Sequence, residues 1–322
     1  AGDVFESNRV DGRTLRRGLD AMADVGLPVF LLPGNHDPLD AASVYRSRAF
    51  REACPANVRV LADSSPVEVR PGVEVVGAPW ASKRPRGDLV AELAAGLTPA
   101  PGTLRLAVAH GAVDEGAPDP DDAALIRLET ARRALGEGRF HYLALGDRHS
   151  ATRLEERIHY SGTPEVTDFD EERPGRVLVV ELGEGRCEVE EHEVGAWRFV
   201  ARRVELGGDV EVARLAVELE EIPDKPRTAL RLALSGALPL HARAALDDLL
   251  AAAGERFAAV LLPGDGPRLI PDALDRDALD LGGYAARAFD RLLAESRGDG
   301  EEAAASRQAL ALFYRLAGGG GG

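Results

Sequence analysis

Residues 28–38, PVFLLPGNHDP, run from a short apolar strand directly into a polar turn. Glycine, asparagine, aspartate and proline all favour turns, so the loop has an ordinary structural interpretation. It also has a chemical interpretation, because Asn35, His36 and Asp37 place an amide oxygen, an imidazole and a carboxylate side by side. Such groups can bind a metal ion or transfer a proton. This stretch alone leaves both interpretations open, and the rest of the chain separates them.

The surrounding pattern predicts an α/β fold class with a largely buried sheet. Apolar, strand-like runs alternate with runs whose apolar residues recur at helical spacing, which is typical of interleaved strands and helices. Further strands are predicted in NVRVLAD (57–63), VEVVGAPW (73–80), TLRLAVAHG (103–111), FHYLALGD (140–147), RIHYSGTP (157–164) and RVLVVEL (176–182). Helices are predicted at residues 14–25, 45–53, 87–95 and 122–134.

The pattern changes after about residue 206, where it predicts helix, strand, helix and strand in turn. Two further helices are predicted at residues 279–295 and 301–316, followed by a flexible glycine tail. A length of 322 residues also favours more than one domain. We therefore expect an α/β domain over residues 1–205, a small α+β module over 206–275, and helices with the glycine tail over 276–322.

Composition excludes some classes of protein. The chain is 45% hydrophobic and 29% charged, an ordinary globular balance, and no apolar run approaches the roughly 20 residues that span a bilayer. Cys54 and Cys187 lie far apart, which disfavours a zinc ribbon or a disulfide framework and agrees with a cytoplasmic location. A net charge of -15 argues against broad affinity for nucleic acid, but it allows a local cationic groove or bound metal ions.

Side chains of the kinds that bind metals recur where predicted strands end. They are Asp3 after Gly2, Asn35 and His36 after VFLL, His110 after LRLAVA, and Asp147 and His149 after YLALG. Because ligands of open α/β sheets bind outside the carboxyl ends of the strands, we expect these loops to converge. Carboxylate, amide oxygen and imidazole together suit Mn²⁺, Fe²⁺ or Zn²⁺. Two such ions can activate water for attack on a phosphoryl group, and a nearby histidine can protonate the leaving oxygen.

In this order and spacing, GDVFES, GNHD, AHG and LGDRH resemble motifs two to five of the calcineurin-like metallophosphoesterases. The run YLALGDRHS followed by HYSGTPEVTDF is similar to the SbcD-type DNA-repair exonuclease branch of that family. The resemblance covers residues 1 to about 195, and the module after residue 206 more loosely resembles the capping domain. It implies a two-sheet sandwich flanked by helices and a DNA exonuclease subunit that hydrolyses phosphodiesters with metal-activated water.

The resemblance also implies a role for each motif residue. By position, Asp3 would bridge two divalent ions, Asn35, His110 and Asp147 would bind one ion, His149 would bind the other, and His36 would be the catalytic histidine. Manganese is the first expectation for both ions, with Fe²⁺ or Zn²⁺ as alternatives. Arg148 lies between two of these ligands, so it either contacts a phosphate or pairs with a nearby acid.

The sequence departs from the family pattern in two ways. The opening Asp-x-His motif of the family is absent, which suggests a fragment that lacks its first strand, so the second ion would have only Asp3 and His149. The family usually has Gly-His-x-His where this chain has GDRH, residues 146–149. An aspartate at position 147 can still bind a metal, and its added negative charge favours a harder ion.

Other polar residues have plainer interpretations. Four further histidines are predicted to be structural or exposed: His141 and His159, which lie in strand patterns with apolar neighbours, and His192 and His241, which match no motif. Residues 161–169 either line a substrate groove or form a plain turn. The basic run at 82–87, which follows Trp80, is either a solvated loop or a contact for nucleic acid.

The terminal helix carries Ala309, Leu312, Phe313 and Leu316 on one predicted face. Core packing is the simpler role for this face, and docking to an SMC-like coiled-coil ATPase, the partner of SbcD-type nucleases, is the alternative. DNA is the expected substrate, a homodimer is possible, and no membrane association is expected. Two rival functions stay open: a phosphoesterase for small nucleotides, and a non-catalytic scaffold that binds the ATPase.

Overall fold

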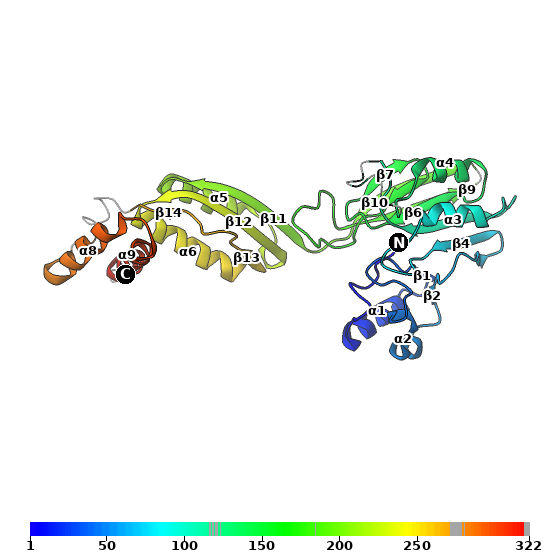
Figure 1. Cartoon of the computed structure of the whole chain (residues 1–322), viewed down its shortest axis with the longest axis horizontal. Coiled ribbons are helices and arrows are strands. Elements are labelled where there is room, and N and C mark those ends of the chain that lie inside the picture. Colours follow the sequence, from blue (N-terminus) through cyan, green and yellow to red (C-terminus); the bar gives the residue numbers. More distant parts are fainter. Residues whose placement is uncertain are drawn as a thin grey trace. The chain divides into compact units, whose positions relative to one another are not determined.

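In the computed structural model the chain forms two compact units, Ala1–Gly195 and Ala196–Gly322 (Figure 1). The structure describes residues 1–115, 117, 119, 122, 124–183, 185–270, 279 and 281–318. The first unit ends at Gly195 rather than at residue 205, because strand β11 (Arg198–Leu206) pairs in parallel with β12 (Thr228–Leu238) of the second unit. Beyond Gly318, the predicted glycine tail lies outside the described residues.

A six-stranded sheet with the order β3-β4-β5-β6-β8-β7 forms the centre of the first unit. Its strands are β3 (Val67–Arg70), β4 (Val73–Ala78), β5 (Leu104–His110), β6 (Tyr142–Gly146), β7 (Thr152–Glu155) and β8 (Ile158–Tyr160). The four inner strands run parallel, and the edge strands β3 and β7 are antiparallel to their neighbours. The carboxyl ends of β4, β5 and β6 therefore lie at one edge of the sheet. This mixed sheet confirms the predicted α/β class.

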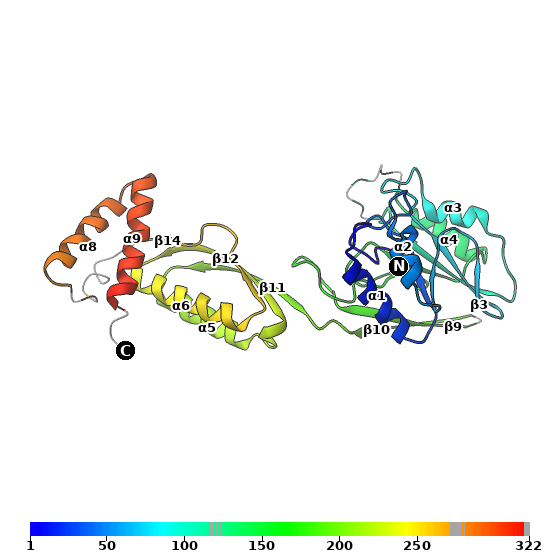
Figure 2. The same ribbon diagram turned by 90° about the horizontal axis from the view of Figure 1, so that it is seen from below.

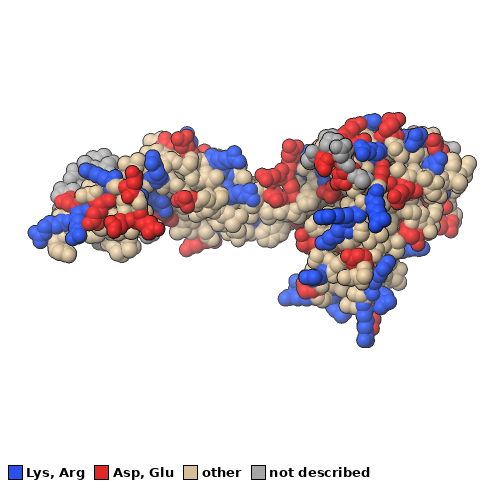
Figure 3. All heavy atoms as spheres, in the orientation of Figure 1, with Lys and Arg blue, Asp and Glu red and all other residues tan. Residues whose placement is uncertain are grey.

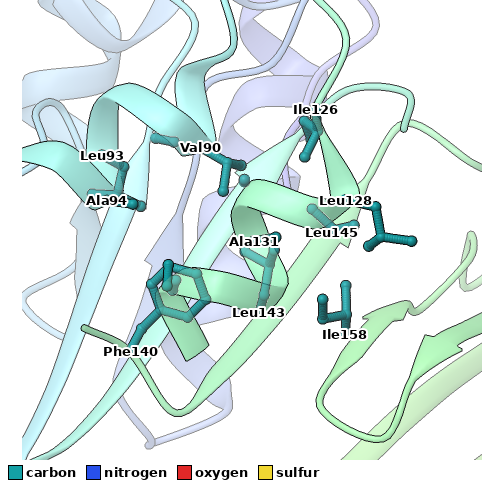
Figure 4. Close-up of a cluster of buried hydrophobic side chains, with 14 of the residues drawn as sticks. Val90, Leu93, Ala94, Ile126, Leu128, Ala131, Phe140, Leu143, Leu145 and Ile158 are labelled. Carbon is teal, nitrogen blue, oxygen red and sulfur yellow. The ribbon is translucent and has the colours of Figure 1, made fainter. Parts of the chain in front are cut away.

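Helices α3 (Leu89–Gly96) and α4 (Leu128–Gly136) cover one face of this sheet (Figure 4). Val90 and Leu93 of α3 and Ala131 of α4 belong to the same buried cluster as Ala107 and Leu143 of the sheet. Helix α3 begins where it does because the Asp88 side chain accepts hydrogen bonds from two otherwise unpaired amides of the first turn.

A two-stranded parallel sheet, β1 (Val29–Leu31) with β2 (Val58–Val60), lies on the other face. Leu32 and Leu61 beside these strands pack with Val75 of β4. A side chain at Gly77 would lie 2.7 Å from the Cβ of Leu61, so this glycine allows the close approach. Helices α1 (Gly12–Asp24) and α2 (Arg48–Ala53), with the short helix η1 (Val44–Arg46), complete a helix–sheet–sheet–helix order of layers. The hairpin of β9 (Arg176–Gly183) and β10 (Arg186–Glu193) is a separate element (Figure 2).

The second unit has the predicted order of helix, strand, helix and strand. Its elements are β11, α5 (Asp209–Glu221), η2 (Lys225–Arg227), β12, α6 (Leu240–Arg256), β13 (Ala259–Leu261), β14 (Arg268–Leu269), α8 (Gly283–Ser296) and α9 (Glu301–Gly318). Strands β11, β12 and β13 form a parallel sheet whose apolar side chains pack with α5 and α6.

The predicted face of the terminal helix was wrong in part. Leu310 is the fully buried leucine of α9, and it packs in one cluster with Phe289 of α8. Leu312 and Leu316 are exposed instead. Within the described part of the chain, every helix is too short or too polar to cross a bilayer.

Candidate functional site

Two adjacent parallel strands carry the first polar groups to one edge of the sheet. His110 is the last residue of β5 and pairs in register with Gly146, the last residue of β6, and Asp147 follows directly. Asn35 follows β1 by four residues. His110 therefore belongs to the strand itself rather than to the loop after it, and residues 1–10 contain no strand ahead of or around Asp3.

Three oxygen atoms surround one ring nitrogen of His110, whose side chain is almost completely buried. Nε2 of His110 lies 2.7 Å from Oδ1 of Asn35, 3.2 Å from Oδ2 of Asp3 and 3.6 Å from Oδ1 of Asp147. The other ring nitrogen, Nδ1, lies 2.9 Å from the carbonyl oxygen of Ala1. A backbone carbonyl can only accept a hydrogen bond, so Nδ1 carries a proton, and Nε2 of the neutral ring faces three acceptors with its lone pair.

The cluster requires a positive charge between these atoms. Burial alone would lower the pKa of His110, but the hydrogen bond and the negative charge of Asp3 outweigh burial and raise it. Burial likewise opposes the charge on Asp3, yet the contacts with His110 and the amide of His36 lower its pKa. Burial raises the pKa of Asp147. A proton on Nε2 or a metal ion can supply the missing charge.

The donor set suits a divalent metal ion in its chemistry. Two ligands bound at about 2.1 Å and at right angles to each other are separated by about 3.0 Å. The separations of 2.7, 3.2 and 3.6 Å from Nε2 of His110 to the three oxygens bracket this value. The bond from Nδ1 of His110 to a backbone carbonyl is also the usual support of a metal-binding histidine. Even so, among the described residues no three His, Cys, Asp or Glu side chains are arranged as a metal-binding group. A metal site here would therefore also depend on the amide oxygen of Asn35.

Glycines allow the loops of the cluster to approach so closely. A Cβ atom on Gly34 would lie 2.2 Å from Oδ1 of Asp3, and one on Gly2 would lie 2.1 Å from Nδ1 of His110. Asp3 and Asp147 have φ angles of 49° and 98°, conformations that are costly for residues with a side chain. Such strain is concentrated at functional sites in proteins, which supports a functional role for this cluster.

Asp37, the last polar residue of the GNHD loop, has a structural role. Its side chain is completely buried and accepts hydrogen bonds from the amide of Phe5 at 3.0 Å, the amide of Gly34 at 2.7 Å and the hydroxyl of Tyr45 at 2.6 Å. Burial and the neighbouring Asp37 raise the pKa of Tyr45, which therefore stays protonated and keeps donating. Asp37 thus ties the GNHD loop to the segment that carries Asp3.

A cavity of about 550 Å³ opens beside the cluster. His36, Arg148 and His149 line it, together with parts of residues 161–168, so the predicted groove segment does face the candidate site. The side chain of His36 is half exposed, and its Nδ1 lies 3.1 Å from the carbonyl oxygen of Glu6. Arg148 is also part of the cavity wall.

His149 shares the cavity but contacts different partners from the other predicted ligands. Its Nδ1 lies 2.7 Å from Oε1 of Glu171 and 2.9 Å from Oγ1 of Thr167. Sequence reasoning missed both partners, because each lies in a polar loop and only the folded loop brings it to the histidine. The acidic run DFDEE offered no signal that distinguished Glu171 from its neighbours.

The remaining candidates have structural surroundings. Trp80 is buried, and its indole Nε1 donates to the carbonyl oxygen of His110 at 2.7 Å, so it supports the cluster and cannot stack on a nucleic-acid base. His141 accepts a hydrogen bond from the amide of Arg105, and His159 is buried against the ring of Tyr142. His192 and His241 pair with nearby acids, as expected for structural or surface residues.

Comparison with protein-family models and with curated protein sequences gave no match. The resemblance to metallophosphoesterases therefore stays a prediction that rests on the motifs and on the geometry of the candidate site.

Proposed function

We propose that the first unit is a metal-dependent phosphodiesterase of the calcineurin-like type. The observation that carries the proposal is the convergence of Asp3, Asn35 and Asp147 on Nε2 of His110, which brings four groups of the kinds that bind metals to one point. The helix–sheet–sheet–helix order of layers supports the metallophosphoesterase sandwich that the motifs imply. The cavity beside the cluster supplies room for a phosphoryl group.

In this proposal Asp3, Asn35, His110 and Asp147 hold a divalent ion, with Mn²⁺ as the first expectation. A bound divalent ion would supply positive charge for phosphoryl oxygens and lower the pKa of water. His36 lines the cavity, and its Nδ1 faces the carbonyl of Glu6, so Nε2 is the nitrogen left for the leaving oxygen. It gives that oxygen a proton from the form of the ring that is protonated on both nitrogens. Arg148 binds a phosphate oxygen through its guanidinium group.

The second ion of the family pattern has weaker support. One carboxylate oxygen of Asp3, Oδ1, already accepts a hydrogen bond from the amide of His36 at 2.9 Å. His149 is bound to Glu171 on the other side of its ring. We therefore propose one well-defined ion site, with a second site that depends on Asp3 and His149 alone.

DNA is the proposed substrate, on the strength of the SbcD-type run that ends in HYSGTPEVTDF and lines the cavity. The overall charge of -15 weakens this choice relative to a small phosphodiester. Figure 3 shows small groups of basic side chains among acidic ones on the visible face of the first unit. A local contact with the nucleic-acid backbone therefore stays compatible with the surface.

The test measures Mn²⁺ binding by the full chain in a calorimeter and then hydrolysis of bis-p-nitrophenyl phosphate and of linear DNA. We expect Asp3→Ala and His110→Ala to lose both metal binding and hydrolysis, because they remove cluster donors. Release of nucleotides from DNA supports the exonuclease proposal. Hydrolysis of the small diester alone would favour the small-nucleotide rival, and neither activity would favour the scaffold.

A partner surface on α9 is the second proposal that the sequence motivates. Leu312 and Leu316 are 51% and 74% exposed, although both are large and apolar. We infer that this face docks the coiled coil of an SMC-like ATPase, with homodimerisation as the competing outcome. Sedimentation of the chain alone, and of Leu312→Asp/Leu316→Asp, tests self-association. Co-purification with the coiled coil of an SMC-like ATPase, which should survive only in the unmodified chain, tests docking.

A further inference from the structure

The side chain of Glu171 is only 6% exposed, although it lies in a polar loop. Both oxygens of its carboxylate accept hydrogen bonds. Oε2 accepts from the amide of Thr167 at 3.0 Å, and Oε1 accepts from Oγ1 of Thr167 at 2.5 Å and from Nδ1 of His149 at 2.7 Å. The amide and the hydroxyl of Thr167 thus hold the carboxylate in place independently of the imidazole of His149. Glu171 is therefore held rigidly beside a ring that is itself 57% exposed.

The three histidines of the cavity share one arrangement. Nδ1 of His36 lies 3.1 Å from the carbonyl of Glu6, Nδ1 of His110 lies 2.9 Å from the carbonyl of Ala1, and Nδ1 of His149 lies 2.7 Å from Glu171. In each case an oxygen acceptor holds the proton on Nδ1 and leaves Nε2 as the nitrogen with a free lone pair. A side-chain carboxylate is the nearest acceptor only for His149, while backbone carbonyls are nearest for the other two, and the Glu6 carboxylate lies 3.5 Å from Nδ1 of His36. The acceptor of His149 can therefore be removed by mutation without altering the main chain.

We propose that Glu171 is a positioning residue that fixes the ring of His149 with its proton on Nδ1 and presents Nε2 to the cavity. The proposal rests on the proposed function in one respect, that the cavity is where a phosphodiester is bound. Oriented carboxylates play this part beside catalytic and metal-binding histidines, because they fix both the tautomer and the direction of the ring. Thr167 belongs to the same device, since it holds both oxygens of the carboxylate.

The first test reads the tautomer directly. Nitrogen NMR of the full chain, labelled at histidine and recorded where the rings are neutral, distinguishes a protonated Nδ1 from a protonated Nε2. His149→Gln assigns the signals. We expect a protonated Nδ1 in the unmodified chain and a mixture of tautomers in Glu171→Ala. Glu171→Gln retains an oxygen acceptor for Nδ1 and should largely rescue the tautomer.

Two further variants keep the test sound if Glu171→Ala folds poorly. Thr167→Val removes one hydrogen bond to the carboxylate and also the oxygen that lies 2.9 Å from Nδ1 of His149, and it should give an intermediate shift because Glu171 stays in place. Glu172→Ala removes the exposed neighbouring carboxylate and should leave the tautomer unchanged. A protonated Nδ1 that survives in Glu171→Ala, or a shift of equal size in Glu172→Ala, would overturn the proposal.

Activity provides the second readout. Glu171→Ala should lower the rate of phosphodiester hydrolysis by about 10- to 100-fold, the usual effect of losing such a supporting group. A changed tautomer in a protein that hydrolyses no phosphodiester at all would uphold the positioning role and refute the proposed function. A changed tautomer with unaltered hydrolysis would refute the link between His149 and catalysis, so the two failures are distinguishable.

Discussion

Replacing Gly34 with alanine tests the candidate site without removing any of its donor atoms. The added Cβ would lie 2.2 Å from Oδ1 and 2.5 Å from the backbone nitrogen of Asp3, whereas ordinary contacts begin near 3.4 Å. Because a Cβ atom essentially never lies within 3.0 Å of another heavy atom, Asp3 and residue 34 must move apart by at least 0.8 Å, the difference between 3.0 and 2.2 Å. The short distance to the backbone nitrogen means that rotation of the side chain cannot relieve the clash.

The displacement has a predictable cost. It breaks the hydrogen bond from the amide of His36 to Oδ1 of Asp3 and the contact between Oδ2 and His110. Loss of one hydrogen bond to a charged group costs about 1.5–3 kcal/mol. Since every 1.4 kcal/mol is a factor of ten, Mn²⁺ should bind about 10- to 100-fold more weakly to Gly34→Ala than to the unmodified protein.

Calorimetric titration with Mn²⁺ measures this effect, and Gly136→Ala provides the matched control. Gly136 lies in α4 with nothing within 4 Å of the position that a Cβ atom would occupy, so alanine there should leave metal binding unchanged. It should also raise stability slightly, by about 0.4–1 kcal/mol, because the unfolded chain loses freedom. Equal affinity of Gly34→Ala and Gly136→Ala for Mn²⁺ would show that Asp3 is no ligand and would refute the cluster as a metal site.

Three further predictions concern other parts of the first unit. His36→Ala should abolish hydrolysis and retain Mn²⁺ in calorimetry, because this ring lies outside the donor cluster; simultaneous loss of metal would refute its role in proton transfer. Tyr45→Phe should lower the free energy of urea unfolding by about 1.5–3 kcal/mol, because it removes a hydrogen bond to a buried carboxylate, while Tyr284→Phe at an exposed site should not. Burial lowers the pKa of His159 below its unfolded value of about 6.5, so the unfolded chain binds more protons and stability falls as the pH drops through 6.5. His159→Phe should therefore flatten the change in unfolding free energy between pH 8 and 5.5, and an unaltered pH profile would contradict this reasoning.

Periodicity predicted most elements of the fold, but it failed where packing decides. The strand RFVARRVEL, residues 198–206, was missed because its three arginines obscure the apolar alternation. In α9 the spacing placed Leu312 and Leu316 on a packing face, whereas the neighbouring α8 covers Leu310 instead. Helical spacing predicts which apolar residues lie on one face of a helix. Only the position of the neighbouring helix shows which residues of that face are buried.

The sequence predicted which motif residues gather at the candidate site, but it did not predict the residues that hold them in place. Asp3, Asn35, His110 and Asp147 do converge. The strand-end rule accounts for His110 and Asp147, at the ends of the parallel strands β5 and β6. Asp3 follows no strand in the structure, and Asn35 follows β1 of the other sheet. His149 was predicted as a ligand, and the structure places it in the cavity with a carboxylate partner that no motif contains. Such partners depend on how a loop folds back, and sequence spacing carries little information about that.

If the first unit binds a phosphodiester as proposed, the charge of the donor cluster indicates where the attraction for the substrate comes from. Asp3 and Asp147 contribute -2 when ionised, Asn35 and the neutral ring of His110 contribute nothing, so one divalent ion brings the cluster to zero. With histidine in place of Asp147, the same ion would leave a net charge of +1 and would attract the phosphate. Among the described residues that line the cavity, Arg148 is the only lysine or arginine. We therefore expect Arg148 to supply most of the attraction for the substrate anion, so that Arg148→Ala raises KM far more than it lowers kcat. Equal KM values for the variant and the unmodified protein would contradict this expectation. They would mean that the bound ion attracts the substrate anion, and that Asp3 and Asp147 do not neutralise the whole charge of that ion.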